Sequence, residues 1–418
     1  MSGRLGVLFL VALGLLSPAR VVAVTEPADV RLLTADPQGW ALHPAITSGA
    51  DGTLYAAWAQ HLRPDKGEYV GIYVQQSATP AWKSLGGRIG HRDGESGAQW
   101  PESHAPSLAV VNGIPYVAWY EAGGYGWGKE GDSAVFVAHW QTDRWILDRD
   151  AGTTSGALNT LPARAAREPT LAVIDGMLHA AWIETVYQEG FGTHNVIAVK
   201  RLMQGRWASA GRPFRAASSG DSRIMALALA GLAGTPFVAW SELPLARPGE
   251  RAIVQVARLE DTDWKKVGRP LNALSDGYAG FVAMAGVGDT LHVAWQERPL
   301  AGTTRVYERA WRTGSWAASA LSLNADPARA AGRPALSAAG SRLWLAWTEG
   351  GRGERPKLFV RSLSPGGWSS PLGSPNADLH EGAADTPGLA PVPGGIALIW
   401  AEKRLPPATK QVYLRMLK

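Results

Sequence analysis

One short pattern of apolar and polar positions recurs seven times along the chain. Its clearest part is a strand-length run of small and apolar residues around a tryptophan, with a glutamate or glutamine two positions later, as in GMLHAAWIE at 176–184. The tryptophans are spaced 52 to 63 residues apart and are Trp58, Trp119, Trp182, Trp240, Trp295, Trp347 and Trp400. A regular period of this size is typical of a solenoid, a propeller or another repeat array.

Each repeat predicts four strands. A small-residue segment such as PTLAVIDG at 169–176 precedes the tryptophan motif, and an alternating segment such as NVIAVKRL at 195–202 follows it, before a strand that opens with another tryptophan. Alternation, β-branched residues and punctuation by Gly, Asp and Asn indicate strands, and no segment has a helical period. The pattern predicts an all-β fold, a seven-bladed β-propeller of four-stranded antiparallel blades, with the small-residue strand nearest the axis.

The two ends of the chain complete this picture. The last repeat ends after its third strand, and ADVRLLTAD at 28–36 precedes the first repeat where the missing fourth strand would come from. We therefore expect a ring closed by an N-terminal strand that completes the last blade, which would remove an exposed sheet edge. Residues 24–418 are expected to form this single propeller domain.

The first 23 residues have the pattern of a signal peptide. Arg4 precedes an apolar stretch at 5–16, and small residues follow around Ala23, where we expect cleavage. Twelve apolar residues are fewer than the roughly 20 that cross a bilayer. We expect a bacterial periplasmic or secreted protein without stable membrane insertion after cleavage.

Composition narrows the possible chemistry. The 418 residues are 46% hydrophobic and contain no Cys, which excludes a disordered chain, disulfides, Cys-ligated metals and a thiol nucleophile. The net charge of +5 falls to +3 once a leader with Arg4 and Arg20 is removed, and there is no basic run, so we expect no nucleic-acid partner. Phosphate-loop, dinucleotide-binding and zinc-protease motifs are absent from the sequence, so we expect neither cofactor nor metal.

The residues that recur in every repeat are interpreted as structural. A tryptophan at one place in each repeat suits a wedge between neighbouring blades. The following glutamates are Glu121, Glu184, Glu242, Glu297, Glu349 and Glu402. Because the next strand often ends in arginine, we expect a repeated polar or ionic tie; these arginines are Arg201, Arg258, Arg309, Arg361 and Arg415.

Positions that differ between repeats are the candidates for function. Residues near the starts of the innermost strands should surround one mouth of the channel: His43, His104, Arg167, Arg223, Arg333 and Asp385. Aromatic and polar residues of the first three repeats add a rim there: Trp40, Trp100, Tyr120, Tyr125, Trp127, Tyr187 and His194. Flat rings beside polar groups suit a sugar ring, and packing that closes the mouth is the alternative. His43 and His104 have no carboxylate partner in evidence for a metal site.

The recurring pattern resembles the sialidase-like propellers of exported bacterial proteins, including BNR-repeat proteins. In sialidases an Arg-Ile-Pro segment and two further arginines bind a carboxylate; here Arg167-Glu168-Pro169 keeps the Arg and the Pro, and SGADGT at 48–53 partly matches an Asp box. By this resemblance Arg167, Arg223 and Arg333 could form a carboxylate clamp. Sialidases have six blades, whereas seven repeats are present here.

Two classes of function follow. The first is a non-catalytic, monomeric recognition propeller that binds a glycan or an envelope or extracellular protein at the channel mouth and the aromatic rim. The second is a sialidase-like glycoside hydrolase or lyase, in which Tyr120 with Glu121, or Tyr187 with Glu184, would supply the reactive pair. A scaffold for envelope assembly is a further alternative.

Overall fold

The computed structural model describes most of the chain. The described residues are 29–34, 39–61, 70–78, 81–90, 102–122, 133–150, 156–160, 165–188, 192–215, 222–245, 249–378, 380, 382–404 and 409–418. Their regular elements are all β-strands. No helix among them is long and apolar enough to span a membrane. The expected signal peptide at 1–23 lies outside the described residues.

The strands form consecutive antiparallel sets, and β1 (Val30–Leu32) precedes them. The next two sets are β2 (Trp40–Ser48), β3 (Leu54–His61), β4 (Val70–Gln76) and β5 (Lys83–Ser84), then β6 (Glu102–Val111), β7 (Ile114–Ala122), β8 (Ser133–Gln141) and β9 (Arg144–Leu147). They are followed by β10 (Ala166–Ile174), β11 (Met177–Gln188), β12 (Gly192–Met203), β13 (Arg206–Ser209) and β14 (Phe214–Arg215), then β15 (Ser222–Leu232), β16 (Thr235–Pro244), β17 (Ile253–Glu260) and β18 (Asp263–Lys266).

The C-terminal half continues in the same way. Its strands are β19 (Tyr278–Val287), β20 (Thr290–Arg298), β21 (Arg305–Arg312), β22 (Ser315–Trp316) and β23 (Leu321–Ser322), then β24 (Ala330–Ala339), β25 (Arg342–Gly350), β26 (Lys357–Ser364), β27 (Gly367–Trp368) and β28 (Leu372–Gly373), and finally β29 (Ala383–Val392), β30 (Gly395–Arg404) and β31 (Thr409–Leu417). The last set meets the first through one parallel pair, Trp40 with Lys410. β1 pairs antiparallel with β31, with Val30 opposite Arg415.

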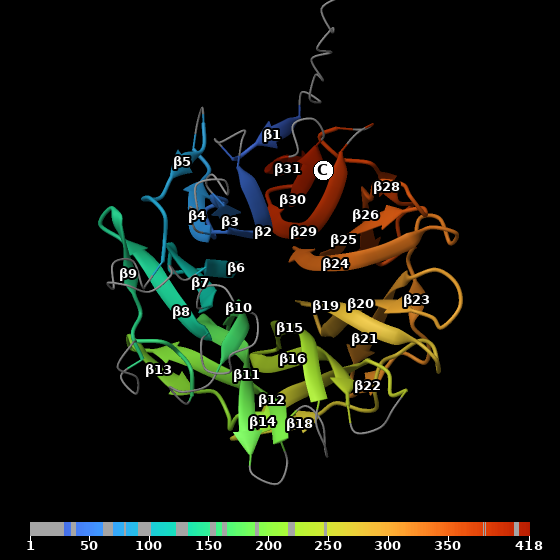
Figure 1. Ribbon diagram of the computed structural model, residues 1–418, viewed down its shortest axis with the longest axis horizontal. Coiled ribbons are helices and arrows are strands. Elements are labelled where there is room, and N and C mark those ends of the chain that lie inside the picture. Colours follow the sequence, from blue (N-terminus) through green and yellow to red (C-terminus); the bar gives the residue numbers. More distant parts are fainter. Residues whose placement is uncertain are drawn as a thin grey trace, which may run out of the picture.

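Figure 1 shows the sheets arranged around a common centre, with the first strand of each sheet innermost. Each first strand contacts that of the next sheet, from β2 through β6, β10, β15, β19 and β24 to β29, and β29 also contacts β2. Small residues make this approach possible: a Cβ on Gly286 would lie 2.5 Å from the carbonyl oxygen of Gly231. The prediction that small-residue strands lie innermost is confirmed.

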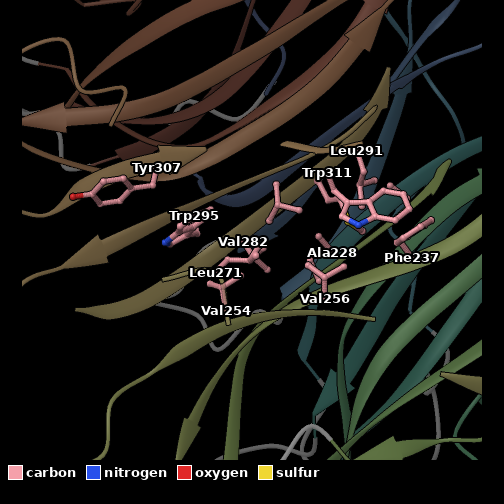
Figure 2. Close-up of a cluster of buried hydrophobic side chains, with 14 of the residues drawn as sticks. Ala228, Phe237, Val254, Val256, Leu271, Val282, Leu291, Trp295, Tyr307 and Trp311 are labelled. Carbon is pink, nitrogen blue, oxygen red and sulfur yellow. The ribbon is translucent and has the colours of Figure 1, made fainter. Parts of the chain in front are cut away.

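The hydrophobic core lies between neighbouring sheets. The seven repeated tryptophans are at most 2% exposed, which confirms their expected role as wedges. Around Trp295, for example, one cluster joins Tyr307 and Val282 of its own sheet to Val254 and Val256 of the preceding sheet (Figure 2). Burial of such large apolar surfaces between sheets is the main stabilising contribution that this arrangement offers.

The repeated glutamate forms a polar tie, but its partners differ from those expected. Trp295 donates its indole N–H to Glu297 at 2.8 Å, and the backbone N–H groups of Ala273 and Leu274 donate to the same carboxylate at 2.9 and 3.0 Å. The side chain of Asn272, just upstream, accepts the backbone N–H of Val254 in the preceding sheet. Glu184, Glu349 and Glu402 likewise accept backbone N–H groups of the connection from the preceding sheet, so the glutamate fastens these four sheets to that connection.

The arginines expected to pair with these glutamates mostly make other bonds. Arg258 pairs with Glu260, Arg309 donates to the carbonyl oxygens of Ala317 and Ala318, and Arg415 pairs with Asp29. The expected arginine tie is therefore wrong at these three positions. Backbone amides suit a buried carboxylate better, because they satisfy its oxygens without moving a long side chain.

Candidate functional site

A bulge interrupts the innermost strand of every sheet near the same end. At this point the first strand has one residue more than the second, as between Leu42 and Ala45 or between Gly332 and Ala335. Residues at six of these bulges have a left-handed backbone with φ of 45° to 53°: His43, Ala105, Glu168, Phe281, Arg333 and Thr386. Bulges and strained backbone are frequent at functional sites, because they redirect side chains that a regular strand would not present.

Arg333 forms the centre of a charged cluster at these bulges. Its Nε lies 2.8 Å from Oδ1 of Asp385, and Nζ of Lys410 lies 2.7 Å from the other oxygen of that carboxylate. The guanidinium also lies 4.7 Å above the ring of Phe281, itself 43% exposed. Burial opposes ionisation of Asp385, yet the two cations hold its pKa below the usual range. The cluster is thus a carboxylate shared by two cations next to an exposed ring.

His43 lies within electrostatic range of the same cluster. Part of the residue is exposed, but the surrounding protein still removes much of the water around its ring, and His104, Lys410 and Arg333 add unfavourable charge. Together these effects outweigh the attraction of Asp385 and lower the pKa of His43 to about 4. The ring of His104 lies 5.3 Å from that of Tyr120, which is buried. The two expected histidines therefore lie near each other, and His43 is neutral at pH 7.

We expect the stability of the protein to reflect this lowered pKa. Between pH 6.5 and about 4 a histidine of the unfolded chain takes up a proton, whereas folded His43 does not, so the free energy of unfolding falls as the pH falls. In His43→Asn, whose side chain tolerates positive φ, this part of the pH dependence should disappear. Urea unfolding of both proteins at pH 7 and pH 5 measures the difference. Equal losses of stability would show that His43 is not the responsible group.

Arg167 and Arg223 lie together, apart from the contacts of Arg333. Nη2 of Arg167 donates to the carbonyl oxygen of Ile224 at 3.0 Å, and burial and the charge of Arg223 lower the pKa of Arg167 while Glu168 opposes them. Arg223 is exposed. Arg333 pairs with Asp385, and no described contact joins it to Arg167 or Arg223. The structure thus divides the expected three-arginine clamp into a pair and a separate cluster.

Glu168 is a member of the site that the sequence analysis did not single out. It occupies a bulge next to Arg167, and burial raises its pKa despite that neighbouring cation. Lys410, Phe281 and Thr386 were missed as well. An X-Pro pair at the start of the innermost strand, as in Glu168-Pro169 and Thr386-Pro387, was the available signal for two of these four residues.

The remaining candidates have varied positions. Trp40 is half-buried with Nζ of Lys403 5.5 Å from its ring centre. His194 is buried beside Arg215, so packing and not the rim accounts for its position. Trp100, Tyr125 and Trp127 lie outside the described residues, as does the side chain of Tyr187.

The two reactive pairs expected for catalysis are not supported by the position of their glutamates. Glu121 and Glu184 are completely buried, and each accepts the indole N–H of the tryptophan two residues before it, at 2.9 and 2.8 Å. They are structural ties. Among the described residues no group of three or more potential ligands could hold a metal ion.

Comparison with known proteins gives the fold a context. No family model and no curated protein matches the chain. Among solved structures, the polysaccharide lyase Uly1 is similar with a TM-score of 0.58 and 12% identity, over 90% of this chain and 89% of that one. A protein of unknown function from Dyadobacter fermentans has a TM-score of 0.52 and 11% identity, over 93% of this chain and 99% of that one.

A sialidase from Trypanosoma rangeli is also similar, with a TM-score of 0.46 and 10% identity, over 91% of this chain and 55% of that one. At these identities the similarity concerns the fold. The described sheets surround a common centre, as the resemblance drawn from the repeats implies. The chain therefore has an all-β architecture of the β-propeller type.

Proposed function

We propose that the protein is an exported, monomeric, seven-bladed propeller that binds an acidic glycan at the mouth of its central channel. The unbroken series of contacts among the innermost strands and the pairing of β1 with β31 support seven blades closed by the N-terminal strand. The expected leader supports export to the periplasm or beyond. The likeness to a polysaccharide lyase supports a carbohydrate ligand over a protein partner or an assembly role.

The charge at the channel mouth carries the proposal. Arg333 and Lys410 share the carboxylate of Asp385. Arg167 lies next to Glu168, whose pKa is raised by burial, and Arg223 adds a fourth cation near Arg167. This excess of positive charge suits a ligand carboxylate or sulfate, which guanidinium groups bind strongly. The exposed ring of Phe281 beneath Arg333 offers an apolar surface for the face of a sugar. The aromatic rim expected in the first three repeats would extend the surface.

One observation favours glycan cleavage as a second candidate function. Burial raises the pKa of Glu168, whereas Arg333 and Lys410 keep the pKa of Asp385 low despite its burial. Surroundings that shift the pKa values of two carboxyl groups in opposite directions are what acid–base chemistry on a glycosidic bond uses.

A glycan array at moderate and at high salt tests the proposal. We expect the protein to bind uronic-acid or sulfated glycans more tightly than neutral ones. Loss of one charged hydrogen bond in Arg333→Gln should weaken this binding about 10- to 100-fold. Arg312→Gln, on an exposed turn where Arg312 pairs with Asp289, is the matched control and should bind normally.

Binding of neutral glycans alone, or an Arg333→Gln variant that binds as tightly as the parent, would overturn the proposed site. Incubation with uronic-acid polymers distinguishes recognition from cleavage. Products that disappear in Glu168→Gln, while binding persists, would establish the second candidate; no products would leave recognition as the function.

A further inference from the structure

A second concave site lies between β4–β5 and the β8–β9 hairpin. Its cavity of about 380 Å³ is lined by the backbone of Gly86 and Gly87 and by Arg88, Trp140, Arg144 and Trp145, among others. It is built from segments that take no part in the contacts of Arg333, Asp385 and His43 described at the channel mouth. This groove is referred to below as the Trp140 groove.

At the same place between two other sheets an ion pair lies at the surface. The indole N–H of Trp264 donates to the carbonyl oxygen of Ala210, just as that of Trp145 donates to Leu85, and these bonds align the two grooves. Two residues after Ala210, Nη2 of Arg212 lies 2.6 Å from Oδ1 of Asp263. Arg212 also donates its backbone N–H to Thr262, which fixes the segment across the groove.

The Trp140 groove lacks both halves of that ion pair. By the same alignment Gly87 stands in place of Arg212, and Arg144 stands in place of Asp263. A Cβ at Gly87 would meet no atom within 4 Å, so this side of the groove is open space. Gly87 therefore leaves this place without a side chain, and Arg144 supplies a cation at its edge.

Two tryptophans give the groove an aromatic wall. The rings of Trp140 and Trp145 meet edge to face with centroids 5.4 Å apart, and both are half-buried. Leu202 and Leu259 hold the position of Trp140 in two other sheets, opposite Trp207 and Trp264. Trp311 holds the same position opposite Trp316 in a further sheet, but there it is buried. Trp140 is only half-buried, so it adds a flat apolar surface where the cavity opens.

Cations lie next to this wall. Arg144 is exposed at the hairpin, and the stem of Arg88 packs over Gly71, where a Cβ would lie 2.1 Å from Cγ of Arg88. Asp143 is a carboxylate at the same edge that could accept hydrogen bonds from hydroxyl groups. Aromatic faces bind the apolar face of a sugar, and guanidinium groups bind a carboxylate in a forked geometry.

We propose that the Trp140 groove is a second carbohydrate site, which takes a sugar ring bearing a carboxylate. The ring stacks on the tryptophans and its carboxylate binds Arg144, with Arg88 next to it. This site stands on its own residues and does not depend on binding at the channel mouth.

The test introduces into the Trp140 groove the ion pair that Arg212 and Asp263 form at the corresponding place. The variant Gly87→Arg with Arg144→Asp should fill the Trp140 groove without altering either tryptophan, and it introduces no backbone clash. Trigalacturonic acid is the probe and maltotriose its neutral counterpart, with binding measured by calorimetry and by tryptophan fluorescence. The measurement is made in the Arg333→Gln background, in which the channel mouth binds acidic glycans weakly. There we expect trigalacturonic acid to be preferred to maltotriose, and the added double substitution to weaken this binding at least 10-fold with an unchanged melting temperature.

Two further variants keep the result decisive. If the double variant folds poorly, Arg144→Gln alone serves in its place, because Arg144 is exposed; this variant should bind trigalacturonic acid more weakly. Asp263→Asn, at the corresponding place between the other two sheets, should leave the affinity unchanged. In Arg333→Gln the binding at the Trp140 groove should persist, which separates this site from the channel mouth. Equal binding of the two trisaccharides, or unchanged binding in a folded double variant, would overturn the proposal.

Discussion

Replacing Trp295 with alanine is expected to lower the free energy of unfolding by about 3–5 kcal/mol. Its side chain is completely buried and stacks on Tyr307 with ring centroids 6.0 Å apart. The cavity would lie between two sheets whose backbones are fixed by their own hydrogen bonds, so the surroundings cannot collapse into it (Figure 2). The indole N–H bond to Glu297 would be lost as well.

Urea unfolding of the parent and variant measures this loss. Trp295→Phe keeps most of the ring and should cost less than half as much. Trp316→Ala, in the short outer strand β22, is the control for loss of a tryptophan that lies at the margin of the same core and is only partly buried, and it should also cost less. A Trp295→Ala variant no less stable than Trp316→Ala would contradict the wedge role.

The glutamate tie should have an effect of similar size. In Glu349→Ala the indole N–H of Trp347 and the backbone N–H groups of Ala325 and Asp326 lose their acceptor, since Glu349 binds them at 2.9, 2.9 and 2.7 Å. Each buried donor left without a partner costs about 1–3 kcal/mol, and the two backbone donors are only partly buried, so the total for three donors should be at least about 3 kcal/mol.

Glutamine at the same position tests the charge separately from the shape. Glu349→Gln replaces one acceptor oxygen with an N–H₂ group that faces donors, and it should fall between the parent and the alanine variant. The control is Glu354→Ala, because Glu354 is exposed and pairs only with surface groups such as Arg329; its change should be below about 1 kcal/mol. If Glu349→Ala and Glu354→Ala have the same stability in urea unfolding, the tie is not stabilising.

The repeats were predictable from the sequence because each sheet needs the same residues in the same places. A tryptophan between sheets and small residues near the centre are side-chain requirements, and they leave a visible period. The partners of the glutamates were not predictable in this way. They are backbone N–H groups such as those of Ala325 and Asp326, and a backbone amide has no residue-type signature.

The sequence alignment placed three of the candidate residues one position before the residues that occupy the bulges. His104, Arg167 and Asp385 each lie one residue before the bulge residues Ala105, Glu168 and Thr386. A bulge adds one residue to one strand, so an alignment on the tryptophan of the partner strand misplaces the residue that the bulge presents. Lys410 was missed because it joins the site through β31 and has no counterpart in the innermost strands.

The pairing of β1 with β31 has a consequence for how the chain reaches its fold. Val30 can pair with Arg415 only after residue 415 has been synthesised, so β1 has no partner strand until then. Closing so long a loop is slow compared with forming the hairpins within each sheet. Proteolytic removal of Val30–Leu32 from the folded protein would expose the outer edge of β31, whose unpaired N–H and C=O groups could then pair with a strand of another chain.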